Sequence, residues 1–273
     1  AYEQGLKDLI AEFPDRASYR YQLLGYYGDK GRRDEEEAVL RELIAVDPDD
    51  QQVKLRLAAR LLQKKDAAGA EALLTENIAK YPDSVDLLLG LGDLYRATQR
   101  PGEAMATYRK AADKWADTTP EGQQARNRIV AQHAVDGNID KARAELEGVL
   151  KAAPDNPDAL LTRATFAFLD RRYDAAIADL RAVLRRRESP EAVLLLARSY
   201  AGTGDLVTAK DTYRQLLAID PQNAEAGAEL AALLTREGDP DAGAELLREV
   251  LARRPDDPKA SVALVETLLA KRD

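Results

Sequence analysis

The sequence contains no cysteine, one histidine, one methionine and one tryptophan. The lack of cysteine excludes disulfide bonds and cysteine-ligated zinc or iron sites. His133 alone is a poor basis for a metal site, because such a site needs several converging ligands. We therefore expect no metal and no cofactor. The missing cysteines do not distinguish a reducing cytosol from a periplasm, so they leave the compartment open.

Long apolar runs and an excess of positive charge are also missing. The longest apolar block runs from Leu87 to Leu91, far below the roughly 18 residues that a membrane-spanning helix needs. The net charge is -8, whereas nucleic-acid binding depends on clustered cations. We expect no direct membrane insertion and no nucleic-acid partner. At 273 residues and 45% apolar, the chain is still able to bury a sizeable core.

The chain begins at Ala1 without an initiator methionine and without a charged-then-apolar leader. We expect that a signal peptide or further N-terminal sequence has been removed and that the sequence is a piece of a longer protein.

Prolines recur at a fixed interval. Pro14, Pro48 and Pro82 are 34 residues apart, and so are Pro221 and Pro255. A period of 34 residues is typical of arrays of helical hairpins. The positions that close the successive repeats, with or without proline, are Pro48, Pro82, Ala116, Pro154, Glu188, Pro221 and Pro255.

Small and large residues alternate at fixed distances from these closing positions. Large residues stand eight before them: Leu40, Leu74, Tyr108, Leu146, Leu180, Tyr213 and Leu247. Mostly small residues stand twelve before them: Glu36, Ala70, Ala104, Ala142, Ala176, Ala209 and Gly243. Two helices approach closely only where side chains are small, and a large residue then fills the hole beside a small one. The alternation predicts that the two helices of each repeat pack closely against each other, and at the same positions in every repeat.

The order within a repeat is helix, turn, helix. The first helix has apolar residues at helical spacing and ends near Gly137, Gly204 or Gly238 in three repeats. The second helix starts at a capping residue such as Asp205 or Asp239. No strand pattern competes with this interpretation.

These features resemble the tetratricopeptide repeat family. The residues that match its consensus are the Leu91-Gly92 pair, Tyr95, Ala104 and the closing Asp47-Pro48 or Asp220-Pro221. The resemblance implies an all-α fold, an α-solenoid in which repeated hairpins form a right-handed superhelix. We expect about sixteen helices, seven pairs plus one at each end.

The resemblance covers residues 1–273 as one solenoid. It begins with the second helix of a truncated repeat at 1–14 and ends with the first helix of another at 256–273. The complete repeats are 15–48, 49–82, 83–116, 121–154, 155–188, 189–221 and 222–255. Glu36 and Arg163 depart from the pattern, and residues 117–122 add about four residues, so we expect irregular geometry at those places.

No constellation of catalytic residues is found, and we predict that the chain is not an enzyme. His133 stands where other repeats place Tyr95 or Tyr200, so a packing role is favoured over a metal or proton-transfer role. Trp115 precedes the inserted residues 117–122, and we expect it to wedge under that loop rather than to anchor a partner.

In this family the first helices line the concave side, where partners bind. The resemblance places these residues in the groove: Tyr21, Leu55, Leu89, Asp93, Asn127, Arg128, Leu161, Thr165, Leu194 and Arg198. A mostly apolar stripe with polar edges suits an amphipathic helix or an extended peptide of a partner. The alternative is that neighbouring repeats cover several of these leucines. The groove lacks the Lys and Asn set with which chaperone-binding members hold a terminal carboxylate, so a chaperone tail is not expected.

We predict a protein-protein interaction scaffold that binds a protein or peptide partner. The bias toward Ala, Arg, Asp and Leu is similar to that of bacterial repeat proteins of envelope, pilus or exopolysaccharide export assemblies. The localisation is unknown, with the periplasm or envelope slightly favoured over the cytoplasm. Two alternatives remain: a regulatory or targeting segment of a larger enzyme or transporter, and a scaffold that assembles with copies of itself.

Overall fold

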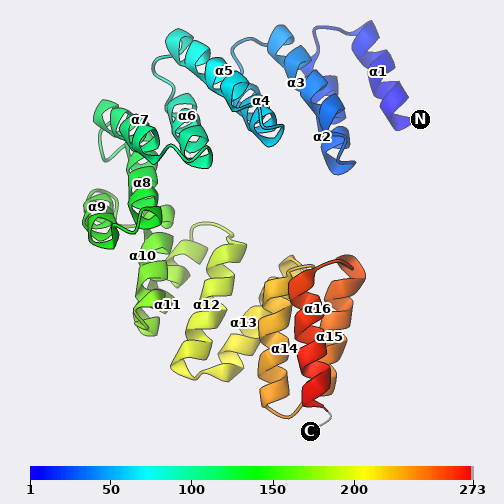
Figure 1. The fold of residues 1–273 in the computed structure, drawn as a ribbon, viewed down its shortest axis with the longest axis vertical. Coiled ribbons are helices and arrows are strands. Elements are labelled where there is room, and N and C mark those ends of the chain that lie inside the picture. Colours follow the sequence, from blue (N-terminus) through cyan, green and yellow to red (C-terminus); the bar gives the residue numbers. More distant parts are fainter. Residues whose placement is uncertain (272–273) are drawn as a thin grey trace. The chain divides into compact units, whose positions relative to one another are not determined.

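A computed structural model describes residues 1–271 of the chain. Within that range it contains sixteen α-helices and no strand, so the predicted all-α architecture and helix count are confirmed (Figure 1). The chain forms two compact units, Ala1–Glu145 and Leu146–Asp273. The boundary between the two units lies inside a helix, α9, and the interpretation of the chain as one solenoid stays a prediction.

The helices of the first unit are α1 (Tyr2–Glu12), α2 (Ala17–Asp29), α3 (Arg33–Val46), α4 (Gln51–Gln63), α5 (Ala67–Lys80), α6 (Val85–Ala97), α7 (Pro101–Lys114) and α8 (Pro120–Val135). Helix α9 (Ile139–Ala152) contains the division. The helices of the second unit are α10 (Pro157–Leu169), α11 (Tyr173–Leu184), α12 (Pro190–Thr203), α13 (Leu206–Ile219), α14 (Ala224–Arg236), α15 (Pro240–Arg253) and α16 (Pro258–Ala270).

Each predicted repeat contains two of these helices, and the two pack against each other within both units. Helix α2 contacts α3, α4 contacts α5 and α6 contacts α7, and the same holds for α10 with α11 and α14 with α15. First helices also contact the first helix of the next repeat, as α4 does with α6 and α14 with α16. The hairpins therefore stack so that first helices of neighbouring repeats lie side by side in these pairs.

Side-chain caps start many of the helices. Asp50 accepts hydrogen bonds from the amides of Gln52 and Val53 at the start of α4. Asp205 and Asp239 cap α13 and α15, as the sequence predicted. Such caps satisfy backbone N–H groups that have no partner inside the helix, and each contributes about 1 kcal/mol.

One turn position has a positive φ in all seven complete repeats, seventeen residues before the closing position. Glycine occupies it in four: Gly31, Gly137, Gly204 and Gly238. The other three residues there, Lys65, Gln99 and Arg171, have φ values of 65, 61 and 59°. The left-handed region costs a non-glycine residue roughly 1–2 kcal/mol, so the hairpin geometry imposes this conformation even where the residue disfavours it. The sequence analysis identified only three of the seven turns by their glycine.

The predicted packing of large against small residues is present. Ala70, Ala104 and Ala176 are completely buried. The ring of Tyr108 lies against Gly92, where a Cβ atom would be 2.3 Å from the ring. Gly92 therefore forms the hole that Tyr108 fills. Replacing one of the large residues of this pattern by alanine, as in Leu74→Ala, is expected to lower the free energy of unfolding by about 2–5 kcal/mol.

Both charged departures from the repeat pattern make ion pairs between neighbouring helices. Glu36 of α3 pairs with the buried Arg60 of α4. Arg163 of α10 donates twice to Asp179 of α11, each time at 2.8 Å. These ion pairs compensate the cost of partial burial, the one of Arg163 through two hydrogen bonds, and α3 and α10 run without a break through both places.

The inserted segment is held close to the end of α7. Thr119 caps α8 by accepting a hydrogen bond from the amide of Gly122. A Cβ atom on Gly122 would lie 2.1 Å from the carbonyl oxygen of Ala116, so only glycine fits this approach. Trp115 ends α7, is half-buried and packs against a core cluster that includes Ala125 and Ile129 of α8.

Candidate functional site

The first helices of unit 1 enclose an apolar hollow of about 360 Å³. It lies where α4 meets α6, with Leu74 of α5 at its base. Its apolar lining is formed mainly by Leu55, Ala58, Ala59, Leu62, Gly90, Leu94 and Ala97, and its polar lining by Asp93 and Arg96. Two of the predicted groove residues, Leu55 and Asp93, therefore line one hollow.

Gly90 allows the side chain of Leu55 to approach α6 closely in the wall of this hollow. It stands twenty-six residues before the closing position, where the other repeats have Gln22, Arg56, Arg128, Thr162, Leu195 and Glu229. A Cβ atom on Gly90 would lie 2.4 Å from Cδ2 of Leu55, so the leucine occupies space that any side chain would take. The absence of a side chain at this position lets Leu55 pack directly on the backbone of α6, and both residues line the hollow.

A charged bridge borders the hollow on the side of the next repeat. The hydroxyl of Tyr108 donates to Asp93 at 2.7 Å, and Arg128 of α8 donates to the other oxygen of Asp93 at 3.2 Å. Burial and the neighbouring Asp93 carboxylate raise the pKa of Tyr108 above its usual range. The predicted groove residues Asp93 and Arg128 are therefore partners of each other.

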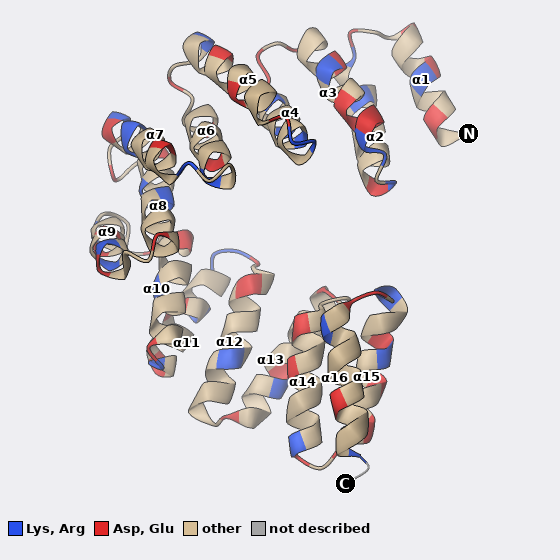
Figure 2. Ribbon diagram, in the orientation of Figure 1, with Lys and Arg blue, Asp and Glu red and all other residues tan. Residues whose placement is uncertain are grey.

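The first helices of unit 2 also form a hollow, of about 510 Å³, between α14 and α16. Its lining includes three carboxylates, Glu225, Glu229 and Glu266, with the exposed Val262. Figure 2 shows acidic and basic residues interspersed along the helices of this unit. The exposed surface of this hollow is still mainly apolar, as in unit 1, but more charged side chains line it.

Arg198 of α12, a predicted groove residue, is the cation of a network on this face. Its Nε lies 3.0 Å from both carboxylate oxygens of Glu229, and its Nη2 lies 2.7 Å from Glu225. The hydroxyl of Tyr213 donates to Glu229 at 2.6 Å, and Lys259 pairs with Glu225 at 3.2 Å. The bond to Glu229 raises the pKa of Arg198, while Arg198 lowers that of Glu225. The guanidinium is committed to these internal contacts.

Two of the predicted groove leucines are buried. Leu89 is 5% exposed and belongs to a core cluster with Ala125 and Ile129 of the following repeat. Leu161 is 9% exposed. We assign both to the core, because the stacked neighbour covers the side of the first helix on which Leu89 lies.

The remaining predicted groove residues lie apart from the hollows. Tyr21 is 38% exposed and donates to the Asp50 cap of α4, and burial together with this bond raises its pKa to about 12. Leu194 and Asn127 are partly buried. The hydroxyl of Thr165 donates to the Leu161 carbonyl in its own helix.

No group of three or more His, Cys, Asp or Glu residues in the described part of the chain is arranged to hold a metal ion. His133 is 9% exposed, in keeping with a packing position. Across residues 1–271, no helix combines the length and apolar character that crossing a membrane requires.

Sequence reasoning missed Gly90 and the acidic partners Glu225 and Glu229. A signal for Gly90 was present, since glycine replaces a side chain that six other repeats carry. Glu229 occupies the same position in the last complete repeat. Its pairing with Arg198 depends on how α12 and α14 stack, which the pattern alone does not specify.

Solved structures with the same fold are numerous, at low sequence identity. Yeast Tom70 has a TM-score of 0.77 at 12% identity, over 98% of this chain and 58% of its own. The APC/C hetero-tetramer Cut9-Hcn1 has a TM-score of 0.65 at 17% identity, over 96% and 51%. A tetratricopeptide repeat protein from Parabacteroides merdae has a TM-score of 0.58 at 14% identity, over 97% and 99%. This chain spans little more than half the length of the first two.

Sequence models of the tetratricopeptide repeat match residues 61–129, and also 133–187, 170–224 and 229–273. No curated protein matches the chain significantly. The family matches cover most of the chain and agree with the observed stack of helical hairpins. This chain belongs to the tetratricopeptide repeat family.

Proposed function

We propose that this chain is a protein-interaction scaffold and that the hollow between α4 and α6 holds an apolar side chain of its partner. Membership of the tetratricopeptide repeat family supports the scaffold role. The observation that carries the site is the apolar hollow of about 360 Å³ on the first-helix layer of unit 1, which Leu55 and Gly90 line.

The chemistry of the hollow indicates what it binds. Its volume of about 360 Å³ lies at the lower end of the range for ligand pockets. An apolar lining takes a side chain such as leucine, methionine or phenylalanine, presented by an amphipathic helix or an extended segment. Asp93 and Arg96 at the edge supply polar contacts that orient the bound segment. Such an anchor contributes most of the binding energy when water is excluded around it.

The bacterial envelope, pilus or export setting rests on composition alone, and it stays a prediction together with the periplasmic or envelope localisation. A regulatory segment of a larger enzyme or transporter would use the same hollow within one longer protein. A self-assembling scaffold would instead fill it from a second copy of the chain.

The substitution Ala59→Leu tests this site, because Ala59 is exposed on α4 and lines the hollow. Peptides are selected from a displayed random library against the unmodified chain, and their affinities are then measured by fluorescence polarisation. A leucine at position 59 fills the hollow, so we expect affinity to fall at least about tenfold.

Ala79→Leu is the matched control, since Ala79 is also exposed but lies on the second helix of the same repeat. It should leave the affinity within about twofold, and both variants should keep a near-normal melting temperature. Peptides that bind the Ala59→Leu chain as tightly as the unmodified one would place the working surface elsewhere. Equal loss in both variants would do the same.

A further inference from the structure

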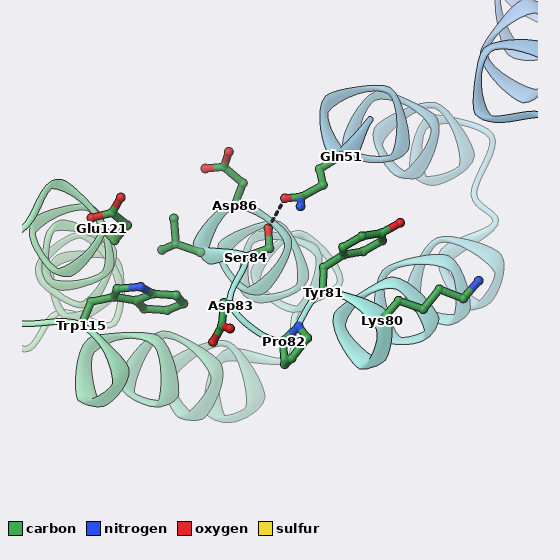
Figure 3. Close-up of a pocket in the computed structure, with 10 residues that line it drawn as sticks. Gln51, Lys80, Tyr81, Pro82, Asp83, Ser84, Asp86, Trp115 and Glu121 are labelled. Carbon is green, nitrogen blue, oxygen red and sulfur yellow. Dashed lines mark hydrogen bonds between the residues drawn. The ribbon is translucent and has the colours of Figure 1, made fainter. Parts of the chain in front are cut away.

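A second hollow in unit 1 lies at the ends of helices rather than on the first-helix layer. Its volume is about 490 Å³, and it is formed where α5 leads into α6 and α7 into α8. Figure 3 shows Trp115 on one side of it, with Asp86 of α6 and Glu121 of α8 nearby. Tyr81 and Ser84 line the opposite part. The hollow thus combines an aromatic wall with carboxylates from two different helices.

The indole of Trp115 already attracts a cation of the protein itself. The ammonium of Lys114 lies 5.4 Å from the centre of the ring and pairs with Asp83 at 2.6 Å. An aromatic face attracts a positive charge because of its quadrupole. Lys114 balances the charge of Asp83 but not the charges of Asp86 and Glu121, the other two carboxylates that line the hollow.

Asp86 and Glu121 have no cationic partner within residues 1–271. Asp86 accepts a hydrogen bond from the neutral side-chain amide of Gln52 at 2.9 Å, and Glu121 makes no ion pair there. Lys80 also lines the hollow, but it pairs with Glu76 at 2.6 Å and its side chain extends away from Trp115 (Figure 3). The two carboxylates therefore give the cavity a negative potential that the protein leaves uncompensated.

We propose that this hollow binds an arginine side chain of a basic peptide. The planar guanidinium stacks on the indole of Trp115 and donates hydrogen bonds to Asp86 and Glu121. Arginine fits better than lysine, because its five donors are fixed in one plane that can stack on an aromatic ring and meet carboxylates at the same time. The carboxylates alone would attract any cation, whereas the indole wall favours a flat one. This site is separate from the hollow between α4 and α6.

The test uses the fact that Trp115 is the only tryptophan in the sequence, so its fluorescence reports on this hollow alone. The chain is titrated at constant ionic strength with a glycine-arginine-glycine tripeptide whose ends are blocked. We expect a saturable change in fluorescence. The same peptide with citrulline, which is planar but uncharged, should bind at least about tenfold more weakly, and the lysine peptide severalfold more weakly.

The variant D86N/E121Q removes both unpaired charges while keeping the shapes of the side chains, and it should weaken the arginine peptide at least about tenfold. E245Q is the control, because Glu245 is exposed on α15 of the other unit. It should leave binding unchanged, and circular dichroism checks that both variants are folded. A fluorescence change that does not saturate overturns the proposal. So does equal binding of the citrulline or lysine peptide, or full affinity in D86N/E121Q.

Discussion

The first-helix layers of the two units carry the same kind of bridge with the charges exchanged. In unit 1 the acid Asp93 belongs to the earlier repeat and the base Arg128 to the next one. In unit 2 the base Arg198 belongs to the earlier repeat and the acid Glu229 to the next one. Each bridge joins a residue that stands twenty-three before the closing position of one repeat to a residue that stands twenty-six before the closing position of the next. The two bridges therefore occupy equivalent positions of the repeat.

A buried tyrosine completes each bridge. Tyr108 donates to Asp93 and Tyr213 donates to Glu229, although the acid lies on opposite sides of the repeat boundary. Both tyrosines stand eight residues before their closing positions. At these two boundaries the stacked hairpins thus bring the same three positions together, and either order of charges satisfies the contact.

The two bridges differ in burial. The side chain of Arg128 is 47% exposed and bonds to one carboxylate, whereas that of Arg198 is 29% exposed and bonds to two. Solvent screens an exposed pair, so the bridge in unit 2 should contribute more to stability. Each layer also has a hollow beside its bridge, lined by Asp93 in unit 1 and by Glu225 and Glu229 in unit 2.

The largest expected effect comes from reversing the charge of Arg198. Arg198→Glu places a carboxylate beside Glu225 and Glu229, and we expect the free energy of unfolding to fall by about 2–4 kcal/mol. The double variant R198E/E229R reproduces the order of charges in unit 1, with Tyr213 donating to the new glutamate. It should recover at least about half of the loss. Urea unfolding followed by circular dichroism measures both changes.

The matched change in unit 1 is Arg128→Glu, which should cost less than about 1 kcal/mol because that pair is more exposed. If the double variant is less stable than R198E, the two bridges are not equivalent. If R198E and R128E lower the free energy of unfolding equally, the difference in burial does not make the bridge in unit 2 the more stabilising one.

Tyr108 and Tyr213 each donate a hydrogen bond to a carboxylate, so we expect the chain to lose stability at alkaline pH. Burial and the acceptor carboxylate raise the pKa values of Tyr108 and Tyr213 above the usual value of about 10. The unfolded chain therefore ionises first, so their contribution is present below about pH 10 and is lost as the pH rises through the folded-state values.

Urea midpoints at pH 8.5 and pH 11 should show a smaller alkaline loss for Y108F and Y213F than for the unmodified chain. Absorbance at 295 nm should show one fewer late-titrating tyrosine in each variant. An equal loss of stability between pH 8.5 and pH 11 in all three proteins would mean that ionisation of Tyr108 and Tyr213 does not cause the loss.

The smallest expected effect concerns the hairpin turns. Two of the three complete repeats in residues 15–116 have non-glycine residues at the positive-φ position, whereas Gly204 and Gly238 occupy it in the last two complete repeats. Lys65→Gly should raise the free energy of unfolding by about 0.5–1 kcal/mol, because relief of the left-handed strain exceeds the added freedom of the unfolded chain. Gly31→Ala, at the same position, should lower it by about 1 kcal/mol. Thermal melts measure both, and a destabilised Lys65→Gly chain would contradict the assigned strain.

The sequence predicted the fold well because its repeat carries redundant information. Proline spacing, the small residues near Ala104 and the large residues near Tyr108 all indicate one hairpin, so a departure such as Glu36 does not obscure it. The groove residues were a different case. Leu55 and Leu89 occupy equivalent positions, yet Leu55 lines a hollow and Leu89 is buried under the next repeat.

The sequence by itself therefore determined the all-α hairpin array and its family, since apolar spacing and turn chemistry act within some 34 residues. Only the tertiary structure decided which side chains of the first-helix layer are free. Arg198 is equivalent to Asp93 and was expected to face a partner, but it bonds to Glu225 and Glu229 of the following repeat. Such contacts depend on the stacking of helices about thirty residues apart in sequence, where a missing side chain at Gly90 or a reversed charge changes the surface without changing the fold.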